Sequence, residues 1–440
     1  MVGINEKLTA PAANEAEVTL IGGTAGFGET VIIHIGNGIW VVVDSCTNPL
    51  NGECVALSYF TDIEVKVEEQ LRYVVCTHWH EDHIMGLSKL IEACSGQTVL
   101  AMSCADDREK FVYEMMEKCN YTGNSRKLTE LRDSINKANK KGIKIKRVQQ
   151  DQMIFNKNGT ECFALSPSSS EIDKFSRELA CAQEKYHKAM GQVAKLKQLG
   201  VAAIEEAAAV EEDIFGAFAD LITEKLDEDS KSLEEVDDLL KYKDAKRVET
   251  NNRCVAMLLK IKGHNVVLGA DLEHDAKKSP DGGWQSVSDS ECMEDVEANL
   301  YKIPHHGSET GYYEYFLHKH IKPDAVSKLT SWIIGAKVLP KAEMLRKYYN
   351  HSKNLYVTTT SLLKRKNNEE NRTFRKIMNE STEEILEFKP LLGIIRSRIN
   401  IDSEDDTWRT EYFGSAKLIE KDYLDSLEKK IEEWVLRNVN

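Results

Sequence analysis

Three histidines and one aspartate stand within six residues of one another, directly after a short apolar run. The run at 71–76 reads LRYVVC and is typical of a buried strand, and His78, His80, Asp82 and His83 follow it. Imidazole and carboxylate groups are the ligands of borderline divalent cations such as Zn²⁺. Since alternate residues of an extended chain project to the same side, His78 and His80 can bind one cation, while Asp82 and His83 can face a second. The chain must therefore fold so that this strand end borders a metal site.

More residues of ligand type come just past the ends of other predicted strands. They are Asp44 after IWVVV, Asp271 after VVLGA, and the pair His305 and His306 after NLYKIP. In sheet proteins that carry their sites at one end, residues that follow strands converge on one edge. A single aspartate in such a place is often only a capping or turn residue. Its repetition beside the histidine cluster indicates one shared site.

The remaining pattern alternates short strands with helices and predicts an α/β chain. Gly22, Gly23, Gly26 and Gly28 are followed by β-branched residues, whereas a phosphate-binding loop needs a helix there. We therefore expect these glycines to connect two strands of a hairpin. Strands are predicted at 17–23, 31–36, 39–45, 71–76, 98–103, 143–148 (an edge strand), 162–165, 254–261, 266–271, 299–303, 325–327, 355–359 and in a closing hairpin at 393–400 and 407–414, and helices up to 93 and at 105–140, 341–350 and 417–437.

Residues 171–250 differ from everything around them. Between 172 and 196 apolar residues are spaced alternately three and four apart, which is a heptad seam. Gly200 can end this helix, and a second apolar-periodic stretch follows, so we expect a coiled-coil-like antiparallel helical hairpin. Two roles stay open for it, a packing insertion or cap, and an arm that binds a partner or dimerises. The seam consists of Ile172, Phe175, Leu179, Ala182, Tyr186, Ala189, Val193 and Leu196.

The net charge of −14 by itself disfavours a nucleic-acid partner. Residues 205–238, however, hold 14 acidic and 2 basic residues and so carry most of that charge. Basic clusters occur at 137–147 and 364–376. A polyanion can therefore still bind one face of the protein.

The chain lacks the signals of membrane insertion and secretion. No apolar stretch approaches the ~20 residues of a membrane helix, and the first residues lack the apolar region of a secretory signal. The ten cysteines form no CxxC pair. We expect a cytoplasmic protein with reduced thiols and no membrane partner.

Four motifs together resemble the motif series of the metallo-β-lactamase-fold hydrolases. These motifs are HWHEDH, VVVDS, VVLGAD and KIPHHGSETG. Within that group the chain is most similar to the soluble hydrolase domain of DNA-uptake competence proteins of the ComEC type. Further markers are Asn251-Asn252, ALSPSSSE at 164–171 and the closing segment GIIRSRIN…TWRTEYFGSA. The likeness covers roughly 17–100, 143–170, 250–360 and 390–416.

The resemblance implies an αββα sandwich of the metallo-β-lactamase type, with the helical hairpin inserted into it. The expected parts are the N-terminal half of the sandwich at 17–170, the helical insertion at 171–250, the C-terminal half at 251–416 and a C-terminal helix at 417–440.

Carried over residue by residue, the resemblance implies two divalent cations, either zinc or manganese. His78 and His80 would bind the first cation. Asp82 and His83 would bind the second, with Asp82 also counted among the catalytic residues. Asp271 would bridge both cations.

The resemblance also implies roles for the residues around this pair. One of His305 and His306 would complete the second metal site, with His306 favoured and His305 acting as a catalytic residue at the scissile group. Asp44 would hydrogen-bond a loop or a ligand histidine from behind. Substrate contacts would come from Ser308, Lys364 and Arg365, although the basic run that contains the last two is equally typical of a solvated helix face.

The chain departs from the family pattern in two places. Most of the superfamily has a histidine between HxHxDH and the bridging aspartate, but the corresponding loop here reads Leu165-Ser166-Pro167-Ser168. The first cation would then have fewer protein ligands, or be a harder ion such as Mn²⁺. The subgroup also often has His-Pro after the HHGS strand, where this chain has Leu339-Pro340.

A pair of divalent cations suits phosphodiester hydrolysis by a metal-activated hydroxide, because the cations neutralise the phosphoryl oxygens and activate water. We therefore expect a metal-dependent phosphodiesterase, and a nuclease in particular. Two alternatives stay open. One is a hydrolase of a small phosphodiester or cyclic nucleotide, and the other is a partner-binding component with a degraded metal site, whose helical insertion would bind a protein partner.

Overall fold

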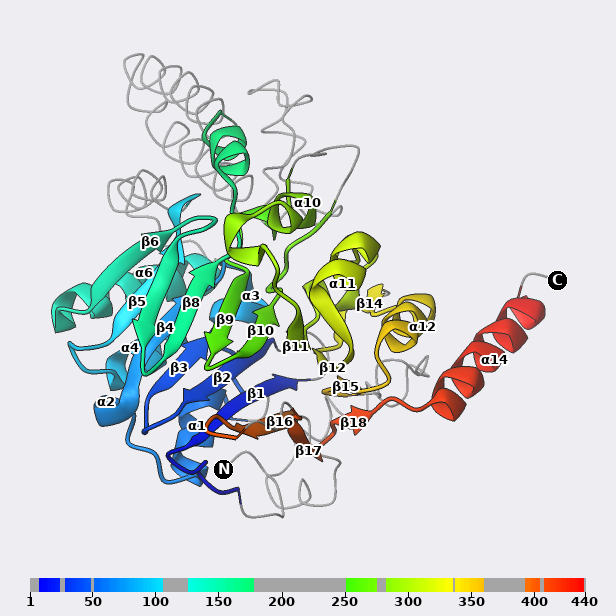
Figure 1. Cartoon of the computed structure of the whole chain (residues 1–440), viewed down its shortest axis with the longest axis horizontal. Helices are drawn as coiled ribbons and strands as arrows, with labels where there is room; N and C mark the ends of the chain where they lie inside the picture. Colours follow the sequence, from blue (N-terminus) through cyan, green and yellow to red (C-terminus); the bar gives the residue numbers. More distant parts are fainter. Residues whose placement is uncertain are drawn as a thin grey trace, which may run out of the picture.

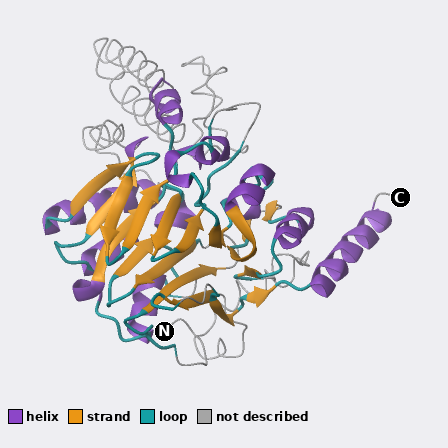
Figure 2. Ribbon diagram, viewed as in Figure 1, coloured by secondary structure: helices purple, strands orange, loops and turns teal. Residues whose placement is uncertain are grey.

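The computed structural model describes residues 8–23, 28–48, 51–105, 126–177, 251–274, 282–334, 337–359, 392–403 and 407–438. In these ranges two eight-stranded sheets lie face to face, and helices cover their outer faces (Figure 1, Figure 2). This αββα arrangement confirms the predicted fold class. Residues 178–250, which hold nearly all of the expected helical hairpin, lie outside the described ranges.

The first sheet comes mainly from the N-terminal part of the chain. Its strands follow the order β17-β16-β1-β2-β3-β4-β5-β6. β3, β4, β5 and β6 are parallel, so their carboxyl ends lie at one edge. The strands are β1 (Glu15–Gly23), β2 (Glu29–Ile35), β3 (Trp40–Val43), β4 (Leu71–Cys76), β5 (Val99–Ser103), β6 (Lys144–Val148), β16 (Leu392–Asn400) and β17 (Arg409–Gly414).

The second sheet follows the order β18-β15-β12-β11-β10-β9-β8-β7. β10, β11, β12 and β15 are parallel and present their carboxyl ends together. The predicted closing hairpin β16–β17 is present, and it joins the first sheet because β16 pairs with β1. The strands are β7 (Met153–Lys157), β8 (Thr160–Ala164), β9 (Met257–Ile261), β10 (His264–Leu268), β11 (Ala298–Lys302), β12 (Ile321–Leu329), β15 (Leu355–Val357) and β18 (Lys417–Leu418), with β13 (Trp332–Ile334) and β14 (Lys337–Leu339) in a separate small sheet.

Alternating side chains divide the core into three apolar layers. In β3, Trp40 and Val42 face the helices, whereas Val41 and Val43 lie between the sheets. Because both faces are covered, such strands read as continuous apolar runs. A third layer separates the second sheet from its helices. The helices are α1 (Val55–Asp62), α2 (Val67–Gln70), α3 (Glu81–Ile84), α4 (Leu87–Ala93), α6 (Arg126–Lys141), α10 (Trp284–Ser288), α11 (Glu314–His320), α12 (Ala342–His351) and α14 (Lys421–Asn438), with 3₁₀ turns η3 (Asn251–Arg253), η4 (Glu291–Met293) and η5 (His305–Gly307).

Two predicted helices have different bounds in the structure. The helix expected after the histidine cluster is split into α3 and α4, because Gly86 between them has a left-handed φ of 89°. The helix expected from 417 begins at Lys421, and residues 417–418 instead pair with β15 as strand β18. For the helix expected at 105–140, only the part from Arg126 onward is described.

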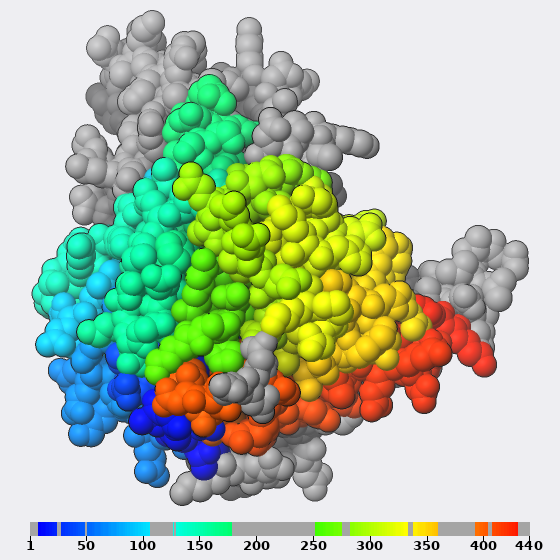
Figure 3. Space-filling model, in the orientation of Figure 1, coloured from blue at the N-terminus to red at the C-terminus, as the bar shows by residue number. Residues whose placement is uncertain are grey.

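The last helix, α14, extends away from the rest of the protein (Figure 1). Arg346 of α12 holds its first turns by donating hydrogen bonds to Asp425 at 2.6 Å and to Glu428 at 2.8 Å. In the space-filling view, the N-terminal residues in blue and cyan and the later ones in green and yellow form one continuous surface (Figure 3). None of the described helices is both long enough and apolar enough to cross a bilayer.

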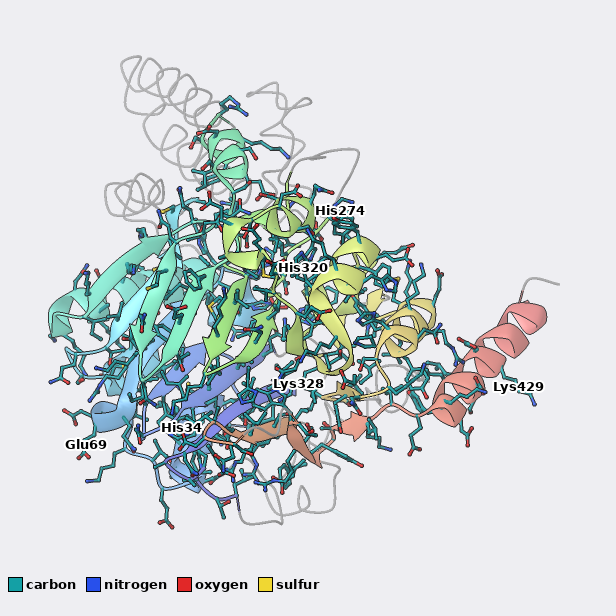
Figure 4. The ribbon with its side chains drawn as sticks, viewed as in Figure 1. His34, Glu69, His274, His320, Lys328 and Lys429 are labelled. Carbon is teal, nitrogen blue, oxygen red and sulfur yellow. The ribbon has the colours of Figure 1, made fainter. Side chains whose placement is uncertain are left out.

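Two lysines lie side by side in the layer between the sheets. Lys302 of β11 and Lys328 of β12 are register neighbours, and both are fully buried. Lys302 forms an ion pair with Glu29 of β2. Lys328, labelled in Figure 4, donates hydrogen bonds to the backbone oxygens of Val18 and Ile395. Burial lowers the pKa of Lys328 well below its ordinary value, because the charged amine is disfavoured away from water.

Replacing Lys328 by methionine is expected to stabilise the protein at pH 7, because the substitution removes a buried amine whose charged form the surroundings disfavour. The folded state binds fewer protons at this lysine than the unfolded state, so wild-type stability rises as the pH rises toward 10.5. Lys328→Met should lose this rise, which urea denaturation at several pH values measures.

Lys302→Met is the matched control on the neighbouring strand. It leaves the buried Glu29 carboxylate without its ion-pair partner, and breaking a buried pair in this way costs about 3–5 kcal/mol. Equal destabilisation by both substitutions would contradict the lowered pKa of Lys328.

Candidate metal centre

Strand ends from both sheets meet at one edge of the sandwich. Asp44 follows β3 and the HWHEDH segment at 78–83 follows β4, in the first sheet. Asp271 comes after β10, and His305 and His306 come after β11, in the second sheet. The two strands in each pair are adjacent and parallel. The fold thus brings together residues that are far apart in the chain. Asp82 and His306, for example, are 224 positions apart, and their side chains are 3.1 Å apart.

A first cluster consists of His78, His80 and Asp271. His78 Nε2 lies 3.0 Å from His80 Nδ1 and 3.8 Å from Asp271 Oδ2. The two histidines leave β4 in extended chain and turn to the same side, as their spacing predicts. Three ligand-type atoms therefore surround one point.

A second cluster consists of Asp82, His83 and His306. His306 Nε2 lies 3.1 Å from Asp82 Oδ2, and His83 Nε2 lies 4.0 Å from the same oxygen. Asp271 reaches this cluster too, with Oδ1 at 3.3 Å from His83 and Oδ2 at 3.9 Å from His306. Asp271 is thus the residue that the two clusters share.

The atoms of both clusters fit a divalent cation. An ion with tetrahedral bonds of about 2.1 Å holds its ligand atoms roughly 3.4 Å apart, and the separations given above lie around that value. His83 Nε2 and Asp271 Oδ1 are buried, and neither makes a hydrogen bond of ordinary geometry with a described residue. Buried polar atoms are normally satisfied, so these two atoms point to a missing partner such as a cation.

The other ring nitrogen of three cluster histidines is held by the protein. Nδ1 of His83 lies 2.7 Å from Asp44 Oδ2, and Nδ1 of His306 lies 3.1 Å from the Thr330 carbonyl. Nδ1 of His78 lies 3.0 Å from the hydroxyl of Thr77. Each contact leaves Nε2 facing the cluster, which is how proteins orient metal-binding imidazoles.

Asp44 ties the ends of β3 and β4 together. Its Oδ1 accepts the Thr77 N–H at 2.7 Å, and its Oδ2 accepts the Thr77 hydroxyl at 2.7 Å besides contacting His83. Burial raises the pKa of Asp44 against the lowering effect of His83 and Thr77. The carboxylate therefore orients one imidazole from behind and does not lie in either cluster.

A buried ion pair lies directly behind the second cluster. Glu29 Oε1 approaches His83 Nδ1 to 4.0 Å and pairs with Lys302, whose Nζ also donates to the Ala270 carbonyl at 3.0 Å. Both charged groups line a cavity of about 10 Å³, room for one water molecule. Burial lowers the pKa of Lys302, but Glu29 and Asp271 outweigh this and raise it, so the ammonium stays charged. Glu29 approaches Nδ1 of His83, the nitrogen that already contacts Asp44, and not the Nε2 that faces the cluster. We therefore do not count Glu29 among the metal ligands.

The titratable groups inside the centre shift one another's pKa. Burial lowers the pKa of His83, but the neighbouring carboxylates, Asp271 foremost, raise it well above its ordinary value. Burial raises the pKa of Asp271, but His83 and His306 lower it well below its ordinary value. Burial and the adjacent imidazoles lower the pKa of His78, which keeps it neutral and able to bind a metal.

In the loop at 165–168, where most of the metallo-β-lactamase superfamily has a histidine, the Ser166 side chain bonds to the backbone. Ser166 Oγ donates to the Cys254 carbonyl at 2.6 Å and accepts the Ala256 N–H at 2.9 Å. The first cluster therefore has three ligand-type residues, whereas the second has its own three together with Asp271. The first cluster therefore offers a cation one protein ligand fewer than the second cluster does.

His305 lies in neither cluster. Its Nδ1 is 2.7 Å from Glu273 Oε1 and 3.0 Å from the hydroxyl of Ser308, which places Ser308 beside it. Lys364 and Arg365, the other expected substrate contacts, lie outside the described ranges.

Sequence reasoning missed Glu29, Lys302 and Glu273. Glu273 follows Asp271, the residue that the two clusters share, by two positions, a spacing that could have drawn attention to it. Glu29 and Lys302 carry no comparable signal, since each is a single charged residue in or beside an apolar strand.

Several backbone conformations at the centre are strained. Asp44, Ala270, His305 and His306 have φ values of 60°, 45°, 43° and 51°, in the left-handed region that non-glycine residues rarely adopt. Such residues cluster at functional sites, where the surrounding structure holds them. Gly28 has a φ of 93° and packs so closely that a Cβ there would lie 2.2 Å from the Asp82 carbonyl oxygen.

Comparisons with known proteins agree with this architecture. Residues 23–102 match the family model of the metallo-beta-lactamase superfamily. Among solved structures, 53 chains match, including one described as "Crystal structure of hydrolase AbOPH in beta lactamase superfamily". That chain is 13% identical, the match covers 37% of this chain and 67% of the other, and the TM-score is 0.23, too low to carry an argument. No curated protein matches.

Gly28→Ala is expected to displace Asp82 and to weaken metal binding at least tenfold, because the new Cβ would overlap the Asp82 backbone. Gly263→Ala is the matched control, since Gly263 has a similar φ of 97° but no atom within 4 Å of its Cβ position. The control should lose only about 1 kcal/mol of stability and retain its metal affinity. Calorimetric titration with Zn²⁺ and Mn²⁺ measures both, and equal affinities in the two variants would contradict the packing argument.

Proposed function

We propose that this chain is a metal-dependent phosphodiesterase and that its substrate is a nucleic acid. The superfamily match over 23–102 supports hydrolysis in general. The observation that carries the proposal is the pair of clusters that share Asp271. The choice of a nucleic acid rests on the resemblance of the HHGS motif series to DNA-uptake hydrolases and on the basic run at 364–376.

The first cation would be held by His78, His80 and Asp271, and the second by Asp82, His83, His306 and Asp271. When bound, two divalent cations supply positive charge for the phosphoryl oxygens and lower the pKa of water. Zinc and manganese both suit a set of imidazole and carboxylate ligands.

The charge of the protein groups favours an anionic substrate once cations are bound. Four carboxylates lie at the centre, against one lysine ammonium, Lys302. Two divalent cations more than offset the remaining three negative charges, so an anion is attracted to the loaded site. The carboxylates are Asp44, Asp82, Asp271 and Glu29.

The chain's own residues hold the reacting groups in this proposal. His305, at the rim of the centre, would donate a proton to the departing oxygen. Ser308, which contacts His305, would border the same substrate position. Asp44 keeps His83 oriented throughout.

The alternative of a partner-binding component with a degraded site has less support. The missing family histidine removes one ligand of the first cluster only, and the second cluster keeps a full set of four. The neighbouring groups that orient His78, His83 and His306 are also in place.

Metal titration is expected to show two affinities, with the tighter site in the second cluster, because that cluster has one more protein ligand. His306→Ala should therefore remove the tighter step and His80→Ala only the weaker one. Elemental analysis after dialysis against low metal concentrations measures the stoichiometry. Loss of the tighter step in His80→Ala would reverse the assignment.

Activity is tested with plasmid DNA, single-stranded DNA and bis-p-nitrophenyl phosphate in the presence of Mn²⁺, Mg²⁺ or Zn²⁺. Wild-type protein should cleave DNA, and Asp271→Ala should reduce turnover by at least 10³-fold because it removes the ligand that both clusters share. Cleavage of the small ester alone would favour a small phosphodiester substrate. If none of the three substrates is cleaved and the protein holds no metal, the partner-binding alternative would be favoured.

A further inference from the structure

His305 is placed differently from its neighbour His306. The His306 side chain is 2% exposed and lies in the second cluster, whereas the His305 side chain is 21% exposed and lies outside both clusters. The two rings are 6.3 Å apart between centroids. His305 is therefore next to the metal centre and still accessible to a bound substrate.

The Nδ1 nitrogen of the His305 ring contacts other side chains of the protein. Nδ1 lies 2.7 Å from Glu273 Oε1 and 3.0 Å from Ser308 Oγ. Nε2 has no hydrogen-bond partner among the described residues. Since a carboxylate only accepts, the ring holds one proton on Nδ1 toward Glu273, and Nε2 is the nitrogen that faces a ligand and carries the second proton when the ring is an imidazolium.

Glu273 is itself held from several directions. Its Oε1 also accepts the Thr310 hydroxyl at 2.8 Å and the Asn251 side-chain amide at 3.2 Å. Its backbone N–H donates to Asn252 Oδ1 at 3.0 Å, and its carbonyl accepts the Trp284 N–H at 3.2 Å. The carboxylate therefore has little freedom to move away from the imidazole.

The backbone of His305 is fixed as well. Its N–H donates to the Ala270 carbonyl at 3.0 Å, and its φ is 43° in a turn whose Ser308 N–H donates to the His305 carbonyl at 2.9 Å. With the backbone set, the orientation of the ring depends on the contact at Nδ1.

We propose that Glu273 is a positioning residue that holds His305 by Nδ1 and so presents Nε2 to the departing oxygen of the phosphodiester. This inference rests on the proposed phosphodiesterase function and adds to it a residue that acts through His305. When the bond between phosphorus and the departing oxygen breaks, its electron pair stays on that oxygen. The imidazolium form of His305, protonated at both ring nitrogens, gives its Nε2 proton to that oxygen and keeps its Nδ1 proton toward Glu273. Water supplies the hydroxyl group that joins phosphorus, and its other proton restores His305.

The inference predicts a dependence on the leaving group. Glu273→Gln should lower kcat on a dinucleotide by about 10²-fold or more, because an alkoxide leaves poorly without a proton. On bis-p-nitrophenyl phosphate, whose phenolate leaves without help, kcat should fall less than about fivefold. His305→Ala should show the same pattern, and the double variant should lose no more than either single one.

The control is Glu309→Gln on the same loop, where the side chain is 64% exposed and pairs with Lys341. It should leave both esters unaffected. Metal content by elemental analysis should be the same in all these variants, since neither Glu273 nor His305 belongs to a cluster.

A second measurement does not depend on turnover. In ¹⁵N-histidine NMR spectra recorded at a pH where His305 is neutral, its ring should be the tautomer protonated at Nδ1 in wild-type protein and should lose that preference in Glu273→Leu. Equal losses of kcat on both esters, or an unchanged tautomer in Glu273→Leu, would overturn the positioning role. Wild-type protein that cleaves neither ester would overturn the phosphodiesterase function as well, so the two failures are distinguishable.

Discussion

Four carboxylates share one seam between the two sheets, and their mutual repulsion is the constraint that the surrounding structure has to satisfy. Asp44, Asp271 and Glu29 are almost fully buried, and Asp82 is only slightly exposed. Grouped carboxylates cost free energy unless positive or hydrogen-bonding partners surround them. His83, between several of them, and Lys302, paired with Glu29, supply part of that compensation. Divalent cations would supply the rest.

The sandwich makes this arrangement possible because the residues that face the clusters differ from the residues that orient them. Residues just past the parallel strands provide the cluster atoms, while groups one step deeper orient them. Asp44 and Thr330 hold the rear nitrogens of His83 and His306, and Glu273 holds that of His305. Each imidazole thus has one nitrogen facing the protein and one facing the space where chemistry would take place.

Local sequence patterns predicted those features of the centre that depend only on residues close together in the chain. The two-residue spacing of His78 and His80 requires only an extended backbone, and the end of β4 provides it. Continuous apolar runs predicted strands covered on both faces, and β3 shows the reason, since its side chains alternate between two cores. The same signals failed at Gly86, where a left-handed glycine divides an expected helix, and at β18, where two residues pair with a distant strand.

Residue patterns along the chain were enough to show which ligand-type residues follow strands. The resemblance of the motifs indicated that Asp271 would join the histidine cluster, and it favoured His306 for the second cation. The packing of the two sheets placed Glu29 and Lys302 behind the second cluster and Glu273 beside His305, none of which the sequence had indicated. Left-handed turns and sheet packing place His306 against Asp82 and His305 against Glu273. Lys302 reaches Glu29 only because two strands 273 positions apart face each other across the core. Such contacts depend on how the sheets pack, and local propensity and spacing carry no information about that distance.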